Sequence, residues 1–139
     1  KRPTGELMSI GIERPTENEF QSSPVQHIIQ IEKGAITTSG NYRKYQQMGD
    51  KKISHLIDPK TGYPFQNDLI SVTVYAQDAI TADGYDNALM GMGMKKALSF
   101  AQKKKNLEAY FIYRKADNTI ADTATAGFYK IMKKTNKDL

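Results

Sequence analysis

The sequence contains no cysteine, and it contains no long apolar run. The absence of cysteine excludes disulfides, thiolate catalysis and zinc–thiolate sites. A membrane-spanning helix needs roughly 20 consecutive apolar residues, and no stretch of this chain approaches that length. Charged residues make up 25% and hydrophobic residues 39% of the chain, which is the ordinary composition of a folded, soluble protein.

Arginine is also scarce, although the formal net charge is +5. The few arginines are scattered, whereas many lysines fall in the second half of the chain. A nucleic-acid-binding surface typically interleaves arginines and aromatic side chains with its lysines. The pattern therefore favours a solvated lysine face on a helix, and it predicts no nucleic acid partner.

Hydrophobic patterning predicts strands on both sides of one helical block. Strands are expected over residues 8–13, 25–32, 35–38, 42–47, 52–57, 69–76, 107–113 and, irregularly, 119–132. Turns are expected at 39–41, 48–50 and 58–62. Helices are expected from Asp78 or Thr81 to Met90 and over 94–105, with a break at 91–93. This order predicts an α+β fold with a mostly antiparallel sheet, as a single domain over residues 1–139 or a part of a larger one.

The segment 55–62, HLIDPKTG, combines two ionisable side chains with a rigid turn. His55 and Asp58 are three residues apart, and Pro59, which fixes its own φ, and Gly62, which tolerates positive φ, favour a tight turn directly after them. Such a turn can hold side chains and amides in fixed positions, as a reacting phosphate requires. The same pattern is common in structural turns, where the aspartate only caps the turn. Both interpretations remain open on these residues alone.

Asp83 and Asn87 are four residues apart on a predicted helix, so their oxygens share one face. Two oxygen ligands on one face suit a hard cation such as magnesium, which completes its shell with phosphate and water. Asp83 is expected in the first helical turn, where the helix N-terminus also favours a phosphate. Asp86 is expected about a quarter turn away from Asn87. The alternative interpretation is that acidic residues in a first turn only complement the helix dipole.

The two clusters occur with further motifs in an order that resembles one protein family. The shared segments are 38–42 (TSGNY), 54–64 (SHLIDPKTGYP), 69–74 (LISVTV), 81–83 (TAD) and 88–93 (ALMGMG). Over about residues 8–128 the chain resembles the second half of the ApbE family of FAD:protein FMN transferases. The resemblance implies an ApbE-like (T-fold-like) structure, with this chain as the C-terminal portion of a larger flavin transferase domain.

The resemblance also implies a reaction and its partners. FAD is cleaved at its diphosphate, FMN is attached to a Thr or Ser hydroxyl of a target protein, and AMP is released. FAD is then a substrate, and Mg²⁺ is the metal cofactor. The implied partner is a flavin-acceptor protein, such as a subunit of a redox-driven ion pump. The family further implies an exported lipoprotein, lipid-anchored in its full-length form on the periplasmic or outer face of a membrane.

Residue by residue, the resemblance implies roles for the positions that match family motifs. Asp83 matches the metal-ligand aspartate, and Asn87 stands where the family usually has a threonine ligand. His55 matches the histidine of the His-x-x-Asp-Pro block, as a base for the acceptor hydroxyl or as a phosphate contact. Asp58 belongs to the same catalytic block. Contacts with FAD are implied for Ser39, Gly40, His55, Thr61 and Gly62.

Two alternatives to FMN transfer remain open. One is a non-catalytic module that binds FAD. The presence of Asn87, where the family has a threonine, is compatible with this alternative. The other is a hydrolase that splits the FAD diphosphate with water as the acceptor. The family's first half supplies much of the flavin pocket and has no counterpart in these residues. Its absence would leave strand edges uncovered, so we expect association with that half, a homo-oligomer or strand exchange.

Overall fold

The computed structural model describes residues 3–15, 24–41, 45–48, 51–54 and 56–133. Its strands are β1 (Met8–Glu13), β2 (Val25–Ile31), β3 (Ala35–Gly40), β4 (Tyr45–Met48), β5 (Lys51–Ser54), β6 (Leu69–Ala76), β7 (Glu108–Arg114) and β8 (Ile120–Ala124). Its helices are α1 (Ala79–Met92), α2 (Met94–Lys103) and α3 (Ala126–Ile131). Every strand pair is antiparallel, so the predicted α+β class is confirmed for the described residues.

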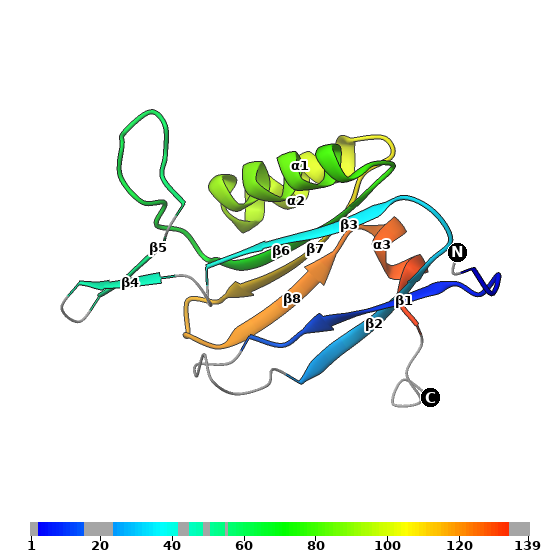
Figure 1. Cartoon of the computed structure of the whole chain (residues 1–139). Helices are drawn as coiled ribbons and strands as arrows, with labels where there is room; N and C mark the ends of the chain where they lie inside the picture. The colour runs from blue at the N-terminus through cyan, green and yellow to red at the C-terminus, as the bar shows by residue number, and fades with distance from the viewer. Residues whose placement is uncertain (1–2, 16–23, 42–44, 49–50, 55, 134–139) are drawn as a thin grey trace.

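The molecule has three layers, and the middle layer is a sheet with the strand order β3-β6-β7-β8 (Figure 1). Helices α1 and α2 cover one face, with α1 over β3 and β6 and α2 over β7. The paired strands β1 and β2 lie with α3 on the opposite face. Strands β4 and β5 pair with each other, as expected for two strands on either side of a predicted turn. Met48 belongs to β4 and not to that turn, and residues 49–50 lie outside the described residues.

Strand β6 is buried on both faces, as expected for a strand between two layers. Its residues in the helix-side core are Leu69, Val72, Val74 and Ala76. Ile70 belongs instead to the core on the β1–β2 side. In a regular strand Ile70 would share a face with Val72, but here the register shifts between Leu69 and Ser71. Such an irregularity breaks the alternation of faces along a strand.

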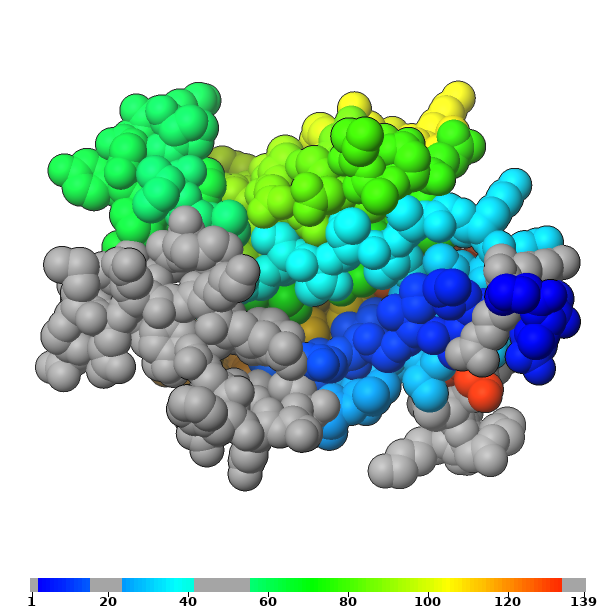
Figure 2. Space-filling model, in the orientation of Figure 1, coloured from blue at the N-terminus to red at the C-terminus, as the bar shows by residue number. Residues whose placement is uncertain are grey.

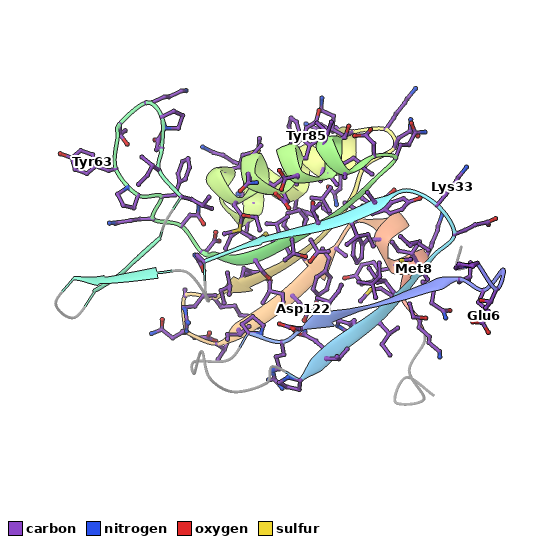
Figure 3. All side chains as sticks on the ribbon, in the orientation of Figure 1. Glu6, Met8, Lys33, Tyr63, Tyr85 and Asp122 are labelled. Carbon is purple, nitrogen blue, oxygen red and sulfur yellow. The ribbon has the colours of Figure 1, made fainter. Side chains whose placement is uncertain are left out.

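The second core lies between the sheet and the β1–β2 pair. Its buried residues are Ile12, Ile29, Ile70, Tyr110, Ile112, Ala124 and Phe128. The rings of Tyr110 and Phe128 stack with centroids 5.7 Å apart. Tyr110 Oη donates a 2.8 Å hydrogen bond to the carboxylate of Asp122, which Figure 3 labels beside β1 and β8. His27 Nε2 lies 3.6 Å from the same carboxylate, so Asp122 links β2 to β8.

Helix α1 begins after Asp78, its N-cap residue and one of the two predicted starting points of this helix. The Asp78 carboxylate accepts the backbone N–H of Thr81 at 2.8 Å and the Thr81 hydroxyl at 2.9 Å. These hydrogen bonds hold the pKa of Asp78 below its ordinary value. The helix then continues through Met92, so the predicted break narrows to Gly93, whose φ of 75° suits glycine. No helix in the described residues is long and apolar enough to cross a membrane.

Two further predictions of secondary structure are wrong. Ser39 and Gly40 continue β3 instead of forming a turn, because they pair with Val72 and Ser71 of β6. Residues 126–131 form α3 instead of extending the last strand. Residues 42–44, part of another predicted strand, lie outside the described residues.

Candidate functional site

The candidate metal ligands lie where α1 packs on β3. Strand pairing places Thr37 opposite Val74 and Ser39 opposite Val72. Both valines belong to the helix-side core. Because directly opposed residues of a strand pair share one face of the sheet, Thr37 and Ser39 also face the helical layer.

Asn87 is held by hydrogen bonds at both ends of its side-chain amide. Ser39 Oγ donates to Asn87 Oδ1 at 3.1 Å, and Asn87 Nδ2 donates to the backbone oxygen of Asp83 at 3.0 Å. A backbone carbonyl only accepts, so the amide nitrogen must be the atom that faces Asp83. Asn87 Oδ1 keeps a second lone pair for another partner. The structure therefore brings together Ser39 and Asn87, which the sequence assigns to separate motifs.

Asp83 lies about one helical turn before Asn87, and its side chain is exposed. Because α1 begins at Ala79, Asp83 is in the second turn of the helix. The prediction that it lies in the first turn is wrong, since Asp78 caps the helix further upstream than Thr81 would. The helix N-terminus is therefore too far upstream to stabilise a phosphate bound beside Asp83. The carboxylate of Asp83 itself remains the basis of the candidate site.

Asp86 points into the interface between α1 and β3 and is only 1% exposed. Within the described residues, Asp86 Oδ1 and Thr37 Oγ1 are buried without hydrogen-bond partners. Burial raises the pKa of Asp86 to about 6; the nearby Thr37 hydroxyl opposes this shift, and the Asp83 carboxylate adds to it. A buried carboxylate with an unsatisfied oxygen is costly and calls for an explanation.

The sequence motifs assign no role to Asp86 or Thr37. A signal was present, however, in the helical periodicity. The buried residues of α1 are Ala82, Asp86, Leu89 and Met90. Their spacing is that of one helix face, so Asp86 places a charge inside an otherwise apolar stripe.

The buried carboxylate of Asp86 gives a prediction for stability against pH. Its pKa in the folded protein, about 6, exceeds its ordinary value of 3.8. The folded state therefore binds the proton more tightly, and stability that is present below pH 4 is lost as the pH rises through 6. Asp86→Asn should avoid that loss. The difference in free energy of unfolding between this variant and wild type should therefore change in favour of the variant by about 2–3 kcal/mol from pH 4 to pH 7. Urea unfolding measures this difference, and a pH-independent difference would contradict it.

The second candidate cluster lies on a turn that projects beyond the C-terminal end of α1 (Figures 1 and 2). Asp58 Oδ1 accepts the N–H of Lys60 at 2.9 Å. The backbone oxygen of Asp58 accepts the N–H groups of Gly62 at 2.8 Å and Thr61 at 3.3 Å. These amides are therefore already paired within the turn. The Thr61 hydroxyl accepts the N–H of Tyr63 at 3.3 Å and keeps its own hydrogen for donation.

The base of this turn is fixed to α1. Gly91 lies so close to Phe65 that a Cβ at this position would approach the ring to 2.8 Å. Asn67 Nδ2 donates to the backbone oxygen of Met90 at 2.7 Å. The turn is thus anchored at the opposite end of α1 from Asp78. His55 lies outside the described residues, so its catalytic role remains a prediction.

The oxygens of Asp83 and Asn87 fit a hard divalent cation, because carboxylate and amide oxygens are the ligands such ions prefer. Within the described residues, no group of three or more His, Cys, Asp or Glu side chains could hold a metal ion. A cation at Asp83 and Asn87 would therefore need further ligands from phosphate, water or residues outside the described ones. The metal role of this pair, the catalytic role of Asp58 and the cofactor contacts remain predictions.

Known proteins resemble this chain over most of its length. A model of the ApbE family matches residues 1–111. The FAD:protein FMN transferase of Salmonella typhimurium is 38% identical over 113 residues, which cover 81% of this chain and 31% of that protein. That of Buchnera aphidicola subsp. Schizaphis graminum is 42% identical over 123 residues, or 88% of this chain and 35% of that protein. The chain thus spans about a third of the length of these relatives.

Solved structures with related sequences have the same fold. The flavin transferase ApbE from Vibrio cholerae matches with a TM-score of 0.72 at 35% identity, covering 89% of this chain and 37% of that one. The apo form of the Pseudomonas stutzeri flavinyl transferase ApbE matches with a TM-score of 0.71 at 30% identity, covering 93% and 38%. The predicted ApbE-like fold is confirmed by these matches.

Proposed function

This chain belongs to the ApbE family, and from that premise we propose that it is the C-terminal part of an FAD:protein FMN transferase. The proposal extends to this chain the activity named in its relatives from Salmonella and Buchnera. The observation that carries it is the hydrogen-bonded series from Ser39 to Asn87 to the backbone of Asp83. This series joins two separate motifs, with the buried Ser39 in contact with the exposed Asn87.

The proposed reaction is a phosphoryl transfer to a Thr or Ser hydroxyl of a target protein. The hydroxyl oxygen bonds to the phosphorus that carries the riboflavin part of FAD. The bond between that phosphorus and the bridging oxygen breaks, and the bridging oxygen leaves with AMP. The hydroxyl proton passes to a base, for which His55 is the candidate. Bound Mg²⁺ would supply positive charge against the phosphate oxygens.

The residues of this chain have distinct parts in that proposal. Asp83 and Asn87 would hold the cation, and Ser39 would keep the Asn87 amide in the orientation that leaves Oδ1 available. Gly40, beside Ser39, would leave room for the flavin. The turn that Asp58 stabilises would present the Thr61 hydroxyl to a phosphate. Preorganised groups of this kind hold the reacting phosphate in place without rearrangement.

Localisation and partner follow from family membership as further proposals. The full-length protein would be exported and lipid-anchored on the periplasmic or outer face of a membrane. Its acceptor would be a membrane-associated protein such as a subunit of a redox-driven ion pump. The remaining part of the transferase domain, or a second copy by strand exchange, would complete the flavin pocket. Membrane fractionation of cells that express the full-length protein tests the localisation, and recovery in the soluble cytoplasmic fraction would contradict it.

The small-molecule products distinguish FMN transfer from its alternatives. The full-length protein is incubated with FAD, Mg²⁺ and an acceptor peptide, and the nucleotides are separated by chromatography. Transfer predicts AMP without a matching amount of free FMN. Equal amounts of free FMN and AMP would identify a hydrolase. Unchanged, protein-bound FAD would identify a binding module, and either of these two outcomes overturns the proposal.

A further inference from the structure

Asp86 is a buried carboxylate that neighbours the proposed metal ligands. It precedes Asn87 in the chain and follows Asp83 by three residues, so the three side chains project within about 100° of one another around α1. Asp83 and Asn87 are exposed, whereas Asp86 is 1% exposed. The charge of Asp86 is therefore buried in the protein, beneath the exposed side chains of Asp83 and Asn87.

The surroundings of Asp86 compensate this charge only in part. Thr37 faces the same interface from β3, yet Thr37 Oγ1 and Asp86 Oδ1 are both buried without hydrogen-bond partners in the described part of the chain. The described residues also form no ion pair with Asp86. Ala82 and Leu89 occupy the same buried stripe of α1. A carboxylate in such a setting destabilises the fold. Packing alone therefore does not explain why an aspartate occupies this position.

We propose that Asp86 is a positioning residue of the metal site, whose buried negative charge increases the affinity of Asp83 and Asn87 for a divalent cation. The inference rests on the proposed function. Asn87 is neutral, so Asp83 and Asn87 together bring one negative charge to a cation that carries two positive charges. Asp86 supplies the second negative charge through the protein, where the effective dielectric constant is lower than in water. Residues just outside a metal's ligands commonly tune its affinity in this way.

This role predicts opposite effects on stability and on metal affinity. Asp86→Asn in the full-length protein should bind Mn²⁺ about 10-fold to 100-fold more weakly, as measured by calorimetric titration without FAD. The thermal midpoint of the metal-free variant should equal or exceed that of wild type, because a buried and only partly compensated charge is gone. A residue that only supports the packing of α1 would instead lower the midpoint when replaced.

Asp78→Asn is the matched control. It removes one charge from the same helix at an exposed position, and asparagine caps helices as well as aspartate does. Its Mn²⁺ affinity should change by less than about threefold, because solvent screens an exposed charge. Asp86→Ala is a second test variant, which removes the charge without introducing an amide, and it should show the same loss of affinity as Asp86→Asn.

The possible outcomes separate this inference from the proposed function. Unchanged Mn²⁺ affinity in both Asp86 variants overturns the inference and leaves the transferase proposal intact. A loss of affinity that occurs only together with a lower thermal midpoint also overturns it, because Asp86 would then be structural. Wild-type protein that transfers FMN but binds no divalent cation overturns the inference and the metal site, while leaving FMN transfer itself standing.

Discussion

Replacing Asp83 by alanine in the full-length protein should lower Mg²⁺-dependent FMN transfer by at least about 100-fold. Asp83 is the charged member of the proposed ligand pair, and its carboxylate is exposed where a cation and its phosphates can reach it. The remaining ligand, Asn87, is neutral and is oriented by Ser39. Flavin fluorescence of the acceptor on a denaturing gel, measured over a range of Mg²⁺ concentrations, gives the rate.

Asp117→Asn is a suitable control for the Asp83 variant. Asp117 is exposed in the turn between β7 and β8, where its carboxylate accepts the N–H and the hydroxyl of Thr119. Asparagine keeps an acceptor for the N–H of Thr119, so this variant should transfer FMN at the wild-type rate. If Asp83→Ala also transfers FMN at that rate, Asp83 is not a metal ligand and the assignment of the site fails.

Replacing Phe128 by alanine should lower the free energy of unfolding by about 3–5 kcal/mol. Phe128 is 0% exposed and stacks on Tyr110, so its loss leaves a cavity between α3 and the sheet. Helix α3 has six residues and is too short to be stable by itself. The variant should therefore also release α3 from the sheet. Urea unfolding measures the stability, and amide hydrogen exchange over 126–131 reports the release.

The adjacent residue provides the comparison for Phe128. Tyr129 is 52% exposed, and its hydroxyl accepts the N–H of Ala124 at 3.1 Å. Tyr129→Phe removes that single hydrogen bond and should cost about 1 kcal/mol. Equal destabilisation by the two variants would contradict the placement of Phe128 in the core.

Elements with strong local signals were predictable from the sequence. Strand β6 is a long β-branched run, and α1 follows a capping aspartate, Asp78, that the structure shows in contact with Thr81. Helix α3 lacked such signals, because Gly127 lowers helix propensity. Long-range contacts determine it instead: the Thr125 hydroxyl donates to the Glu108 carboxylate, and the N–H of Thr125 donates to Ala109 O at 2.9 Å. Gly127 also packs directly against Glu108.

The candidate site was predictable where it depends on spacing along one helix. The shared face of Asp83 and Asn87 follows from helix geometry, and the hydrogen bond from Asn87 Nδ2 to Asp83 O reflects it. The position of Ser39 depends on the pairing of β3 with β6, which no local pattern specifies. Ser39-Gly40-Asn41 is typical of a turn, so the sequence alone did not indicate that Ser39 contacts Asn87. The unpartnered oxygen of Asp86 is likewise visible only in the packed structure.

The proposed activity of the full-length protein is the transfer of FMN from FAD to a hydroxyl of another protein. The intact mass of a Thr-containing acceptor peptide, recorded after incubation with the full-length protein, FAD and Mg²⁺, tests it most directly. The peptide should gain the mass of one FMN less one water, and a peptide with valine in place of the threonine should gain nothing. A threonine peptide of unchanged mass, while FAD is consumed in the same mixture, would rule out FMN transfer.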